Sequence, residues 1–198
     1  ELADRYSFGE LRVSHEQNLI FADVAKHDLH ALWRELRRLG LATPNIGLLT
    51  NIISCPGGDF CSLANARSIP VAEAIQRRFD DLDYLFDVGE IDLNISGCMN
   101  ACGHHHVGHI GILGVDKAGE EFYQIEIGGN QGETQPGARA ALGKVIGPSF
   151  SQEDVPQAIE RLVRCYLDHR EHDEERFVDT VARLGVAPFK EYVYGRSH

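Results

Sequence analysis

The alternation of apolar and polar residues predicts a hairpin and a helix at the start of the chain. Within residues 9–24, Leu11 and Val13 alternate with polar neighbours, and a second short apolar run follows a polar turn. Within residues 28–39, leucines and Trp33 recur on one face at helical spacing, so we expect a helix with Trp33 packed in a core. The pattern predicts a small β–β–α unit.

Strands and cysteine-containing loops alternate in the middle of the chain. Residues 46–53 are mostly apolar and run into a Pro-Gly-Gly loop. A helix is predicted over 63–79, in which Pro70 either kinks the helix or marks its first turn. Period-two alternation and apolar runs predict three further strands, at 91–96, 110–115 and 121–127.

The last quarter of the chain is predicted to be helical. Residues 131–149 are rich in glycine, proline and small side chains and indicate a loop. Ser151 and Asp154 resemble a capping box at the start of a helix over 153–170. A second helix is predicted over 174–184, so the chain should end in two helices.

Composition excludes several classes of protein. The chain has 198 residues, of which 43% are hydrophobic and 25% charged, as in ordinary globular proteins. Its net charge of −11 argues against a nucleic-acid partner, since binding of a duplex depends on Lys and Arg. No stretch approaches the roughly 20 apolar residues of a membrane span, and no secretory signal opens the chain. We therefore expect a cytoplasmic protein. The chain begins at Glu1 and its only methionine is Met99, so we also expect a fragment.

Four of the five cysteines form two pairs. Five residues separate Cys55 from Cys61, and three separate Cys98 from Cys102. Each pair lies in a loop of glycine or small residues after an apolar strand, where free backbone N–H groups can donate to cluster sulfides. The fifth, Cys165, lies in the predicted helix 153–170, where we expect it to be a small buried hydrophobic residue.

Spacing alone leaves three interpretations of the paired cysteines. Four thiolates are what a [4Fe–4S] cluster requires. Structural zinc prefers a shorter spacer than the five residues between Cys55 and Cys61, but remains possible. Reduced structural thiols are the third interpretation, whereas a disulfide does not suit a chain without a secretory signal.

Two segments of this chain are 55–61 (Cys-Pro-Gly-Gly-Asp-Phe-Cys) and 96–103 (Ser-Gly-Cys-Met-Asn-Ala-Cys-Gly). Together they resemble the sirohaem/[4Fe–4S] signature of nitrite and sulfite reductases. Residues 9–19 resemble the family's G-x-L-R-x-T-x-x-Q-N-L stretch, with Ser14 where threonine is usual. Residues 123–130, ending Gly-Gly-Asn, resemble the strand that passes near the macrocycle. The resemblance covers essentially the whole chain.

The resemblance implies an α+β fold and a division of the chain. The family is built from two pseudo-repeated halves, and this chain resembles the second, C-terminal half. Residues 1–45 would form half of a ferredoxin-like unit, and residues 46–150 an α/β domain that binds sirohaem and the cluster. Residues 151–198 would be a C-terminal helical segment packed on that domain.

Cofactors and site residues follow from the same resemblance. It implies a [4Fe–4S] cluster whose ligands are Cys55, Cys61, Cys98 and Cys102. The Cys102 sulfur would also bridge to the iron of a sirohaem, so that the cluster can feed electrons to the haem. It further implies sirohaem contacts from three polar residues, Arg12, His104 and Asn130. Arg12 could equally be a solvated arginine at a strand edge.

The implied reaction is a six-electron reduction, of sulfite to sulfide or of nitrite to ammonia. The implied partners are a small inorganic anion, sulfite or nitrite, and an electron donor protein or flavoprotein. The third partner is the missing N-terminal half, which would bring Arg and Lys to the substrate. We expect the chain to be inactive alone. The alternative is a non-catalytic iron–sulfur electron-transfer module or an inactive fragment.

Four histidines, His104, His105, His106 and His109, follow Cys102 closely. One or more could lie at the macrocycle edge as a proton donor or a partner of a carboxylate. A metal-binding histidine cluster is a second interpretation, and ordinary surface or hydrogen-bonded histidines a third. His104 stands about where the family often has arginine, which leaves anion handling there open.

Overall fold

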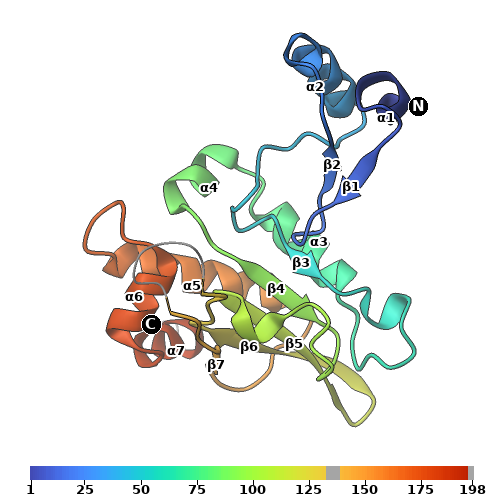
Figure 1. Cartoon of the computed structure of the whole chain (residues 1–198). Helices are drawn as coiled ribbons and strands as arrows, with labels where there is room; N and C mark the ends of the chain where they lie inside the picture. Colours follow the sequence, from blue (N-terminus) through green and yellow to red (C-terminus); the bar gives the residue numbers. More distant parts are fainter. Residues whose placement is uncertain (133–138, 196–198) are drawn as a thin grey trace. The chain divides into compact units, whose positions relative to one another are not determined.

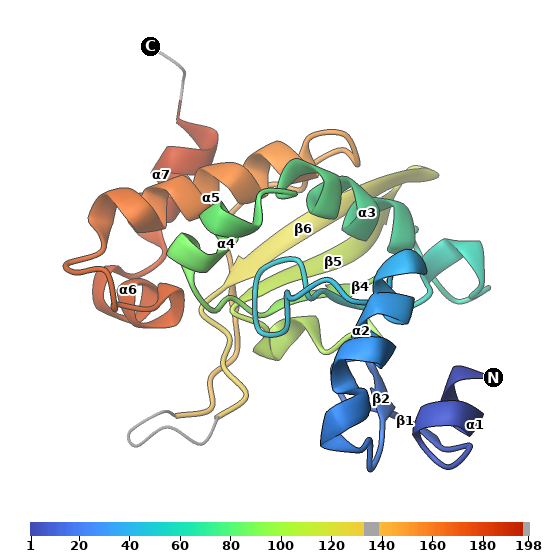
Figure 2. The ribbon, with the colours of Figure 1, turned by 90° about the horizontal axis from the view of Figure 1, so that it is seen from above.

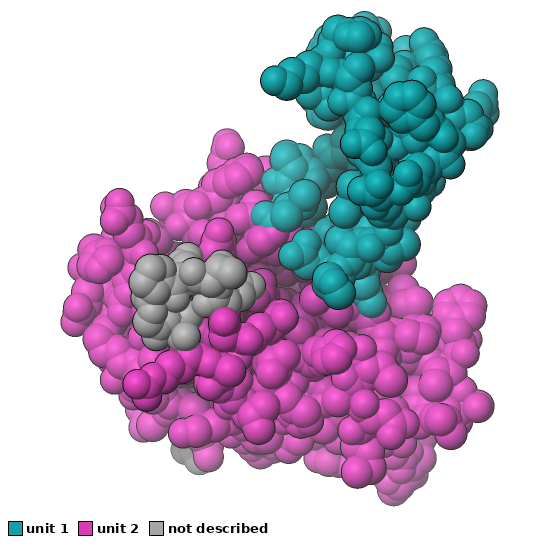
Figure 3. All heavy atoms as spheres, in the orientation of Figure 1, with its two compact units in different colours: residues 1–46 teal, residues 47–198 magenta. Residues whose placement is uncertain are grey.

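The computed structural model describes residues 1–132 and 139–195, in two compact units. The units are Glu1–Ile46 and Gly47–His198 (Figure 3). The helices of the predicted segment 151–198 share the core of the second unit. The division into three domains stays a prediction.

The first unit has the β–β–α order expected from the sequence. A short helix precedes an antiparallel hairpin in which Leu11 pairs with Phe21, and a second helix follows. Its elements are α1 (Leu2–Tyr6), β1 (Leu11–Val13), β2 (Leu19–Phe21), η1 (Lys26–Asp28) and α2 (Leu29–Arg38). The prediction that Trp33 packs in a core is wrong, since its side chain is 43% exposed. Helix α2 buries only Leu32, and the guanidinium of Arg37 lies 5.0 Å from the Trp33 ring centroid.

A five-stranded mixed sheet organises the second unit, in the order β3-β4-β5-β6-β7 (Figure 1). Strands β3, β4 and β5 are parallel to one another, and β5, β6 and β7 are antiparallel. Ala118 and Gly119 join the two longest strands with positive φ angles, as tight hairpins require. The strands are β3 (Ile53–Ser54), β4 (Leu93–Ser96), β5 (Ile110–Lys117), β6 (Glu120–Ile127) and β7 (Lys144–Val145).

Helices cover one face of this sheet (Figure 2). Ile95, Ile112 and Ile125 are aligned across β4, β5 and β6 and are fully buried in the core with residues of the helices. The helices of the second unit are α3 (Ile69–Arg78), α4 (Leu82–Val88), α5 (Val155–His169), α6 (Phe177–Leu184) and α7 (Ala187–Tyr194). No helix of the described residues is long and apolar enough to span a membrane. The expected α+β class is confirmed.

The structure differs from the predicted pattern at three helices and in one loop. Helix α3 begins at Ile69, with Pro70 in its first turn, because the residues before it form the loop after Cys61. Helices α4 and α7 were not expected from the pattern. The predicted loop 131–149 contains β7, and its residues 133–138 lie outside the described part of the chain.

Candidate functional site

The two cysteine loops begin where two neighbouring strands end. Cys55 follows β3, which ends at Ser54, and Cys98 follows β4, which ends at Ser96. Because β3 and β4 are parallel, with Ser54 paired to Ile95, both loops leave the same edge of the sheet. The fold thus brings together two segments about 40 residues apart in sequence.

Backbone hydrogen bonds join the loops. The N–H groups of Asn65 and Ala66 donate to the Gly97 carbonyl at 2.8 and 3.0 Å. The N–H of Gly97 donates to Cys55 Sγ at 3.1 Å. An amide donor aimed at a cysteine sulfur stabilises the thiolate and is typical of iron–sulfur ligands. The two loops therefore form one hydrogen-bonded structure.

Glycines make this close approach possible. A Cβ on Gly57, whose φ is +61°, would lie 2.3 Å from the backbone N of Ser68. A Cβ on Gly97 would lie 2.5 Å from the Ala66 carbonyl oxygen. Both distances are too short for any side chain, so the loops can pack this tightly only with glycine at these positions.

The four paired cysteines differ in exposure. Cys55 and Cys98 are buried, Cys61 is half-buried and Cys102 is exposed, and none forms a disulfide. Among the described residues, no three of their sulfurs lie within 4.8 Å of one another. One tetrahedral zinc ion with Zn–S bonds of about 2.3 Å would hold its sulfurs about 4 Å apart. A four-iron cluster spreads its four ligands over four irons and does not require that convergence.

Cys165 is separate from these loops, as expected. It lies in α5 with no exposed surface. Burial raises the pKa of its thiol to about 11, which keeps it protonated at neutral pH. The structure agrees with a packing role.

Asn130 is buried beside a cavity with a basic lining. Its Oδ1 accepts a hydrogen bond of 2.8 Å from the Gly132 N–H. The cavity has a volume of about 720 Å³, and its lining includes Asn130, Arg139 and Lys144, together with Arg176 and Asp179, which form an ion pair at 2.7 Å. Such a lining suits a carboxylate-bearing or anionic ligand.

His104 does not line this cavity, and the third predicted sirohaem contact, Arg12, belongs to the first unit. Arg12 lies in β1, in the first unit, where its guanidinium pairs with Glu10 and with Asp23 at 3.8 Å. His104 is exposed in a left-handed conformation, and its carbonyl accepts from Asn94 Nδ2 at 3.1 Å. Contacts of Arg12, His104 and Asn130 with sirohaem stay predictions.

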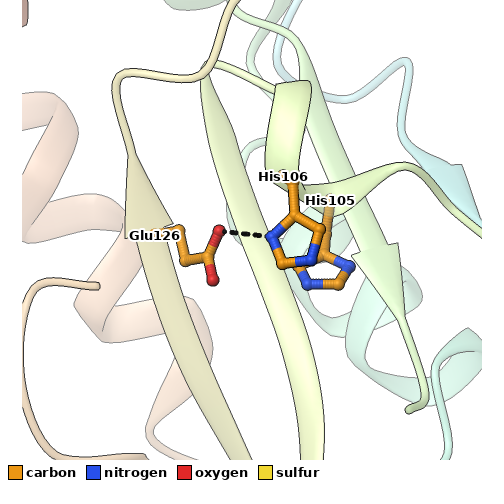
Figure 4. A group of neighbouring side chains, drawn as sticks. All are labelled: His105, His106 and Glu126. Atoms are coloured by element: carbon orange, nitrogen blue, oxygen red, sulfur yellow. Dashed lines mark hydrogen bonds and ion pairs between the residues drawn. The ribbon is translucent and has the colours of Figure 1, made fainter. Parts of the chain in front are cut away.

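Two of the four histidines meet a glutamate that the sequence did not single out. His106 Nδ1 lies 3.1 Å from Glu126 Oε2, and the rings of His105 and His106 are 3.8 Å apart (Figure 4). Burial, and to a lesser degree His106, lower the pKa of His105 to about 4, so it is neutral at pH 7. His109 is separate, since its Nδ1 accepts from the Asp92 N–H. Glu126 carried one signal only, a charge between two isoleucines at the end of a predicted strand.

Family models match both units. The model described as the nitrite and sulphite reductase 4Fe-4S domain matches residues 47–197. The chain belongs to this family. A second model, the nitrite/sulfite reductase ferredoxin-like half domain, matches residues 1–39. The match confirms the resemblance to the family, and with it the [4Fe–4S] cluster and the sirohaem as the cofactors of this family. The assignment to the C-terminal half stays a prediction.

The curated relatives are named as sulfite reductases or as nitrite reductases. The chain is 28% identical to a sulfite reductase [ferredoxin] of Mycobacterium tuberculosis, over 92% of the chain and 34% of the relative. It is 34% identical to a chloroplastic ferredoxin–nitrite reductase of Arabidopsis thaliana, over 82% of the chain and 28% of the relative. The chain thus spans about a third of the length of these relatives.

Solved structures show the same fold. The Mycobacterium tuberculosis NirA protein superposes with a TM-score of 0.75 and 26% identity, over 95% of this chain and 35% of that one. Dissimilatory sulfite reductase I superposes with a TM-score of 0.78 and 13% identity, over 100% of this chain and 64% of that one. At that identity, the second likeness concerns the fold alone.

Proposed function

We propose that this chain is the cluster-binding portion of a sirohaem-dependent reductase that converts sulfite to sulfide or nitrite to ammonia. Cys55, Cys61, Cys98 and Cys102 are the ligands of its [4Fe–4S] cluster. One observation carries the proposal: two cysteine loops leave the same edge of a parallel β-pair and are hydrogen-bonded to each other. The six electrons come from a donor protein, and the substrate is the small anion itself.

Exposure supports different roles for the four thiolates. Cys55 is buried and its sulfur accepts from the Gly97 N–H, so it is suited to hold one iron permanently. Cys102 is exposed, so its sulfur can face a second group as well as the cluster. We infer that Cys102 would help to hold the sirohaem as well as the cluster.

Cluster and sirohaem, when bound, supply the single-electron steps, while the protein positions them and handles charge. The basic lining of the cavity beside Asn130 offers partners for anionic groups, through Arg139 and Lys144. The whole chain nevertheless carries a charge of −11, so an anionic substrate and the sirohaem carboxylates need further basic residues. We infer that these come from another part of the longer protein.

Anaerobic reconstitution with iron and sulfide tests the cluster assignment. We expect about four irons per chain, bound by sulfur, and a broad visible absorption that is lost on oxidation. Cys55→Ala and Cys102→Ala should each lose most of the iron, whereas the matched variant Cys165→Ala should retain it. Stoichiometric zinc with four sulfur ligands, or iron retained in both ligand variants, would contradict the assignment.

A visible spectrum separates the reductase from the alternative, a non-catalytic iron–sulfur module. Sirohaem adds intense Soret-type and red bands, while a cluster alone gives one broad shoulder. The longer protein, purified anaerobically, should show both sets of features. A spectrum with the cluster shoulder alone would favour the electron-transfer module.

A further inference from the structure

A polar row crosses the sheet on the face opposite the apolar core. Asn94 in β4 is paired with Gly111 in β5, and Gly111 is paired with Glu126 in β6. Paired residues on neighbouring strands point to the same face. The residues next along these strands, among them Ile95 and Ile125, point the other way into the core. Two side chains with oxygen ligands thus flank a residue that has no side chain.

A short helix covers this row. Helix η3 (His105–Val107) lies directly over Gly111, where a Cβ would come within 2.1 Å of the His105 carbonyl oxygen. The absence of a side chain at Gly111 therefore lets η3 sit close to the sheet. Figure 4 shows the result: the rings of His105 and His106 lie next to each other, tilted by 43°, with the Glu126 carboxylate facing His106.

The possible metal ligands on His105, His106 and Glu126 converge. One ring nitrogen of His105, one of His106 and a carboxylate oxygen of Glu126 all lie within 4.8 Å of one another. Among the described residues, no other group of three or more histidine, cysteine or acidic side chains converges in this way. The distance between His106 Nδ1 and Glu126 Oε2 is already 3.1 Å.

His105 is fully buried, and neither of its ring nitrogens has a hydrogen-bond partner. A buried polar atom without a partner loses its hydrogen bonds to water and gains none in return, so native proteins leave few of them. The Oδ1 of Asn94, on the same face of the sheet, is also buried without a partner. Two neighbouring defects of this kind indicate that something absent from the polypeptide occupies the space.

We propose that His105, His106 and Glu126 bind a divalent transition-metal ion, with zinc the best match. Two imidazoles and one carboxylate, with a fourth position for water, are a recurrent ligand set for zinc. Mg²⁺ and Ca²⁺ prefer oxygen ligands only, so they suit this site poorly. The site is distinct from the four cysteines, and its existence does not depend on the reductase activity.

The exposure of the three side chains fits such a site. The His106 side chain is 47% exposed, so an ion can reach the proposed metal site from solvent. Glu126 and His105 are buried and hold their positions before the ion arrives. An ion would give one ring nitrogen of His105 a partner, whereas the structure places no acceptor at hydrogen-bond distance from the other.

Zinc retention by the cluster-loaded chain tests the proposal. The reconstituted protein is equilibrated with Zn²⁺ and then dialysed, and zinc, iron and sulfide are counted on the same sample. We expect one zinc per chain with iron unchanged, and X-ray absorption at the zinc edge should show nitrogen and oxygen ligands without sulfur. His106→Ala and Glu126→Gln should each raise the zinc dissociation constant by at least about 100-fold.

Matched variants control for folding and for adventitious binding. Glu120→Gln alters an exposed glutamate of the same strand, and His172→Ala alters an exposed histidine of the same unit, so both should retain zinc. Circular dichroism and iron content check that every variant is folded. Zinc bound through sulfur, no retained zinc, or equal retention in the Glu126→Gln and Glu120→Gln variants would overturn the proposal. An ordered water in place of the ion, seen in a crystal grown with zinc, would do the same.

Discussion

Single glycines decide how closely the two cysteine loops approach. Gly57 and Gly97 lie where the loops touch, and a Cβ at either position would overlap backbone atoms rather than a movable side chain. Backbone cannot move aside without breaking the hydrogen bonds from Asn65 and Ala66 to Gly97. A methyl group here therefore disturbs both cysteine loops at once.

Gly97→Ala is expected to destabilise the chain and to reduce its iron content. The new Cβ would lie 2.5 Å from the Ala66 carbonyl oxygen, and overpacking of this kind costs about 2 kcal/mol or more. Urea unfolding and iron analysis measure the two effects. The matched change is Gly58→Ala, where the nearest atom is the flexible Arg67 Cγ at 3.3 Å. Equal losses in both variants would contradict this account.

Cys165 should resist alkylation in the folded protein. Burial raises its pKa to about 11, so almost no thiolate exists at pH 8. Iodoacetamide on the folded apo-protein should label Cys102, which is exposed, and spare Cys165 until urea is added. Mass spectrometry of the labelled peptides makes the comparison. Labelling of Cys165 at the rate of Cys102 would contradict its assignment to the core.

At the scale of elements, one ion pair helps to join helices α5 and α6. Both carboxylate oxygens of Glu175, just before α6, accept from Arg183 at 2.8 Å. Arg183 also donates to the His169 carbonyl at the end of α5, at 2.9 Å. The pair therefore links two helices as well as two side chains. Because Glu175 is 9% exposed, water screens the pair less than it screens an ordinary surface ion pair.

Glu175→Gln should lower the free energy of unfolding by about 2 kcal/mol at pH 7, since hydrogen bonds to a charged group are lost. Mainly through Arg183, the pKa of Glu175 is lowered from 4.5 to about 2. A lowered pKa in the folded state stabilises above pH 4.5, and this stability is lost as the pH falls towards 2. Urea unfolding at pH 7, 5 and 3 should therefore show the difference between variant and parent shrinking.

Glu174→Gln is the control for this ion pair, because Glu174 is the exposed neighbour of Glu175 in the sequence. Its free energy of unfolding should match that of the parent at each pH. A Glu175→Gln difference that stayed constant from pH 7 to pH 3 would show that the pair is not the cause.

At the scale of the whole molecule, the two units differ in burial. The first unit has only four buried residues, Tyr6, Ser7, Ala22 and Leu32. Large apolar side chains of its hairpin, such as Val13 and Leu19, are more than half exposed. The second unit has a continuous core that runs through the sheet and helices α3 to α7. Burial of apolar surface is the main stabilising contribution in folding, so the units should differ in stability.

Hydrogen exchange should show this difference. We expect the amides of β1 and β2 to exchange faster than those of β4, β5 and β6, by about two orders of magnitude or more. Mass spectrometry of peptic peptides resolves the two units. Equal protection of β1 and β5 would mean that the first unit is stabilised by contacts outside its own small core.

The chain alone is expected not to reduce sulfite or nitrite and to hold sirohaem weakly. Its net charge of −11 disfavours assembly with an anionic substrate and a macrocycle rich in carboxylates, unless further basic residues neutralise them. The purified chain is incubated with sirohaem, iron and sulfide and assayed with a reduced-dye donor. Turnover comparable to that of the longer protein would refute this expectation.

Local pattern was enough for the hairpin, for α2, for the pair β5–β6 and for the long helix α5, because periodicity and turn residues act within one element. The two cysteine pairs were also visible, since metal ligands keep their spacing in sequence. The register that pairs Asn94 with Gly111 was not visible, because β4 and β5 are parallel strands joined across the loop 97–109 and not by a tight turn. Only the tertiary structure placed His105 over Gly111 and beside Glu126. It also showed that Trp33 is exposed, since burial depends on what packs against a side chain and not on its type.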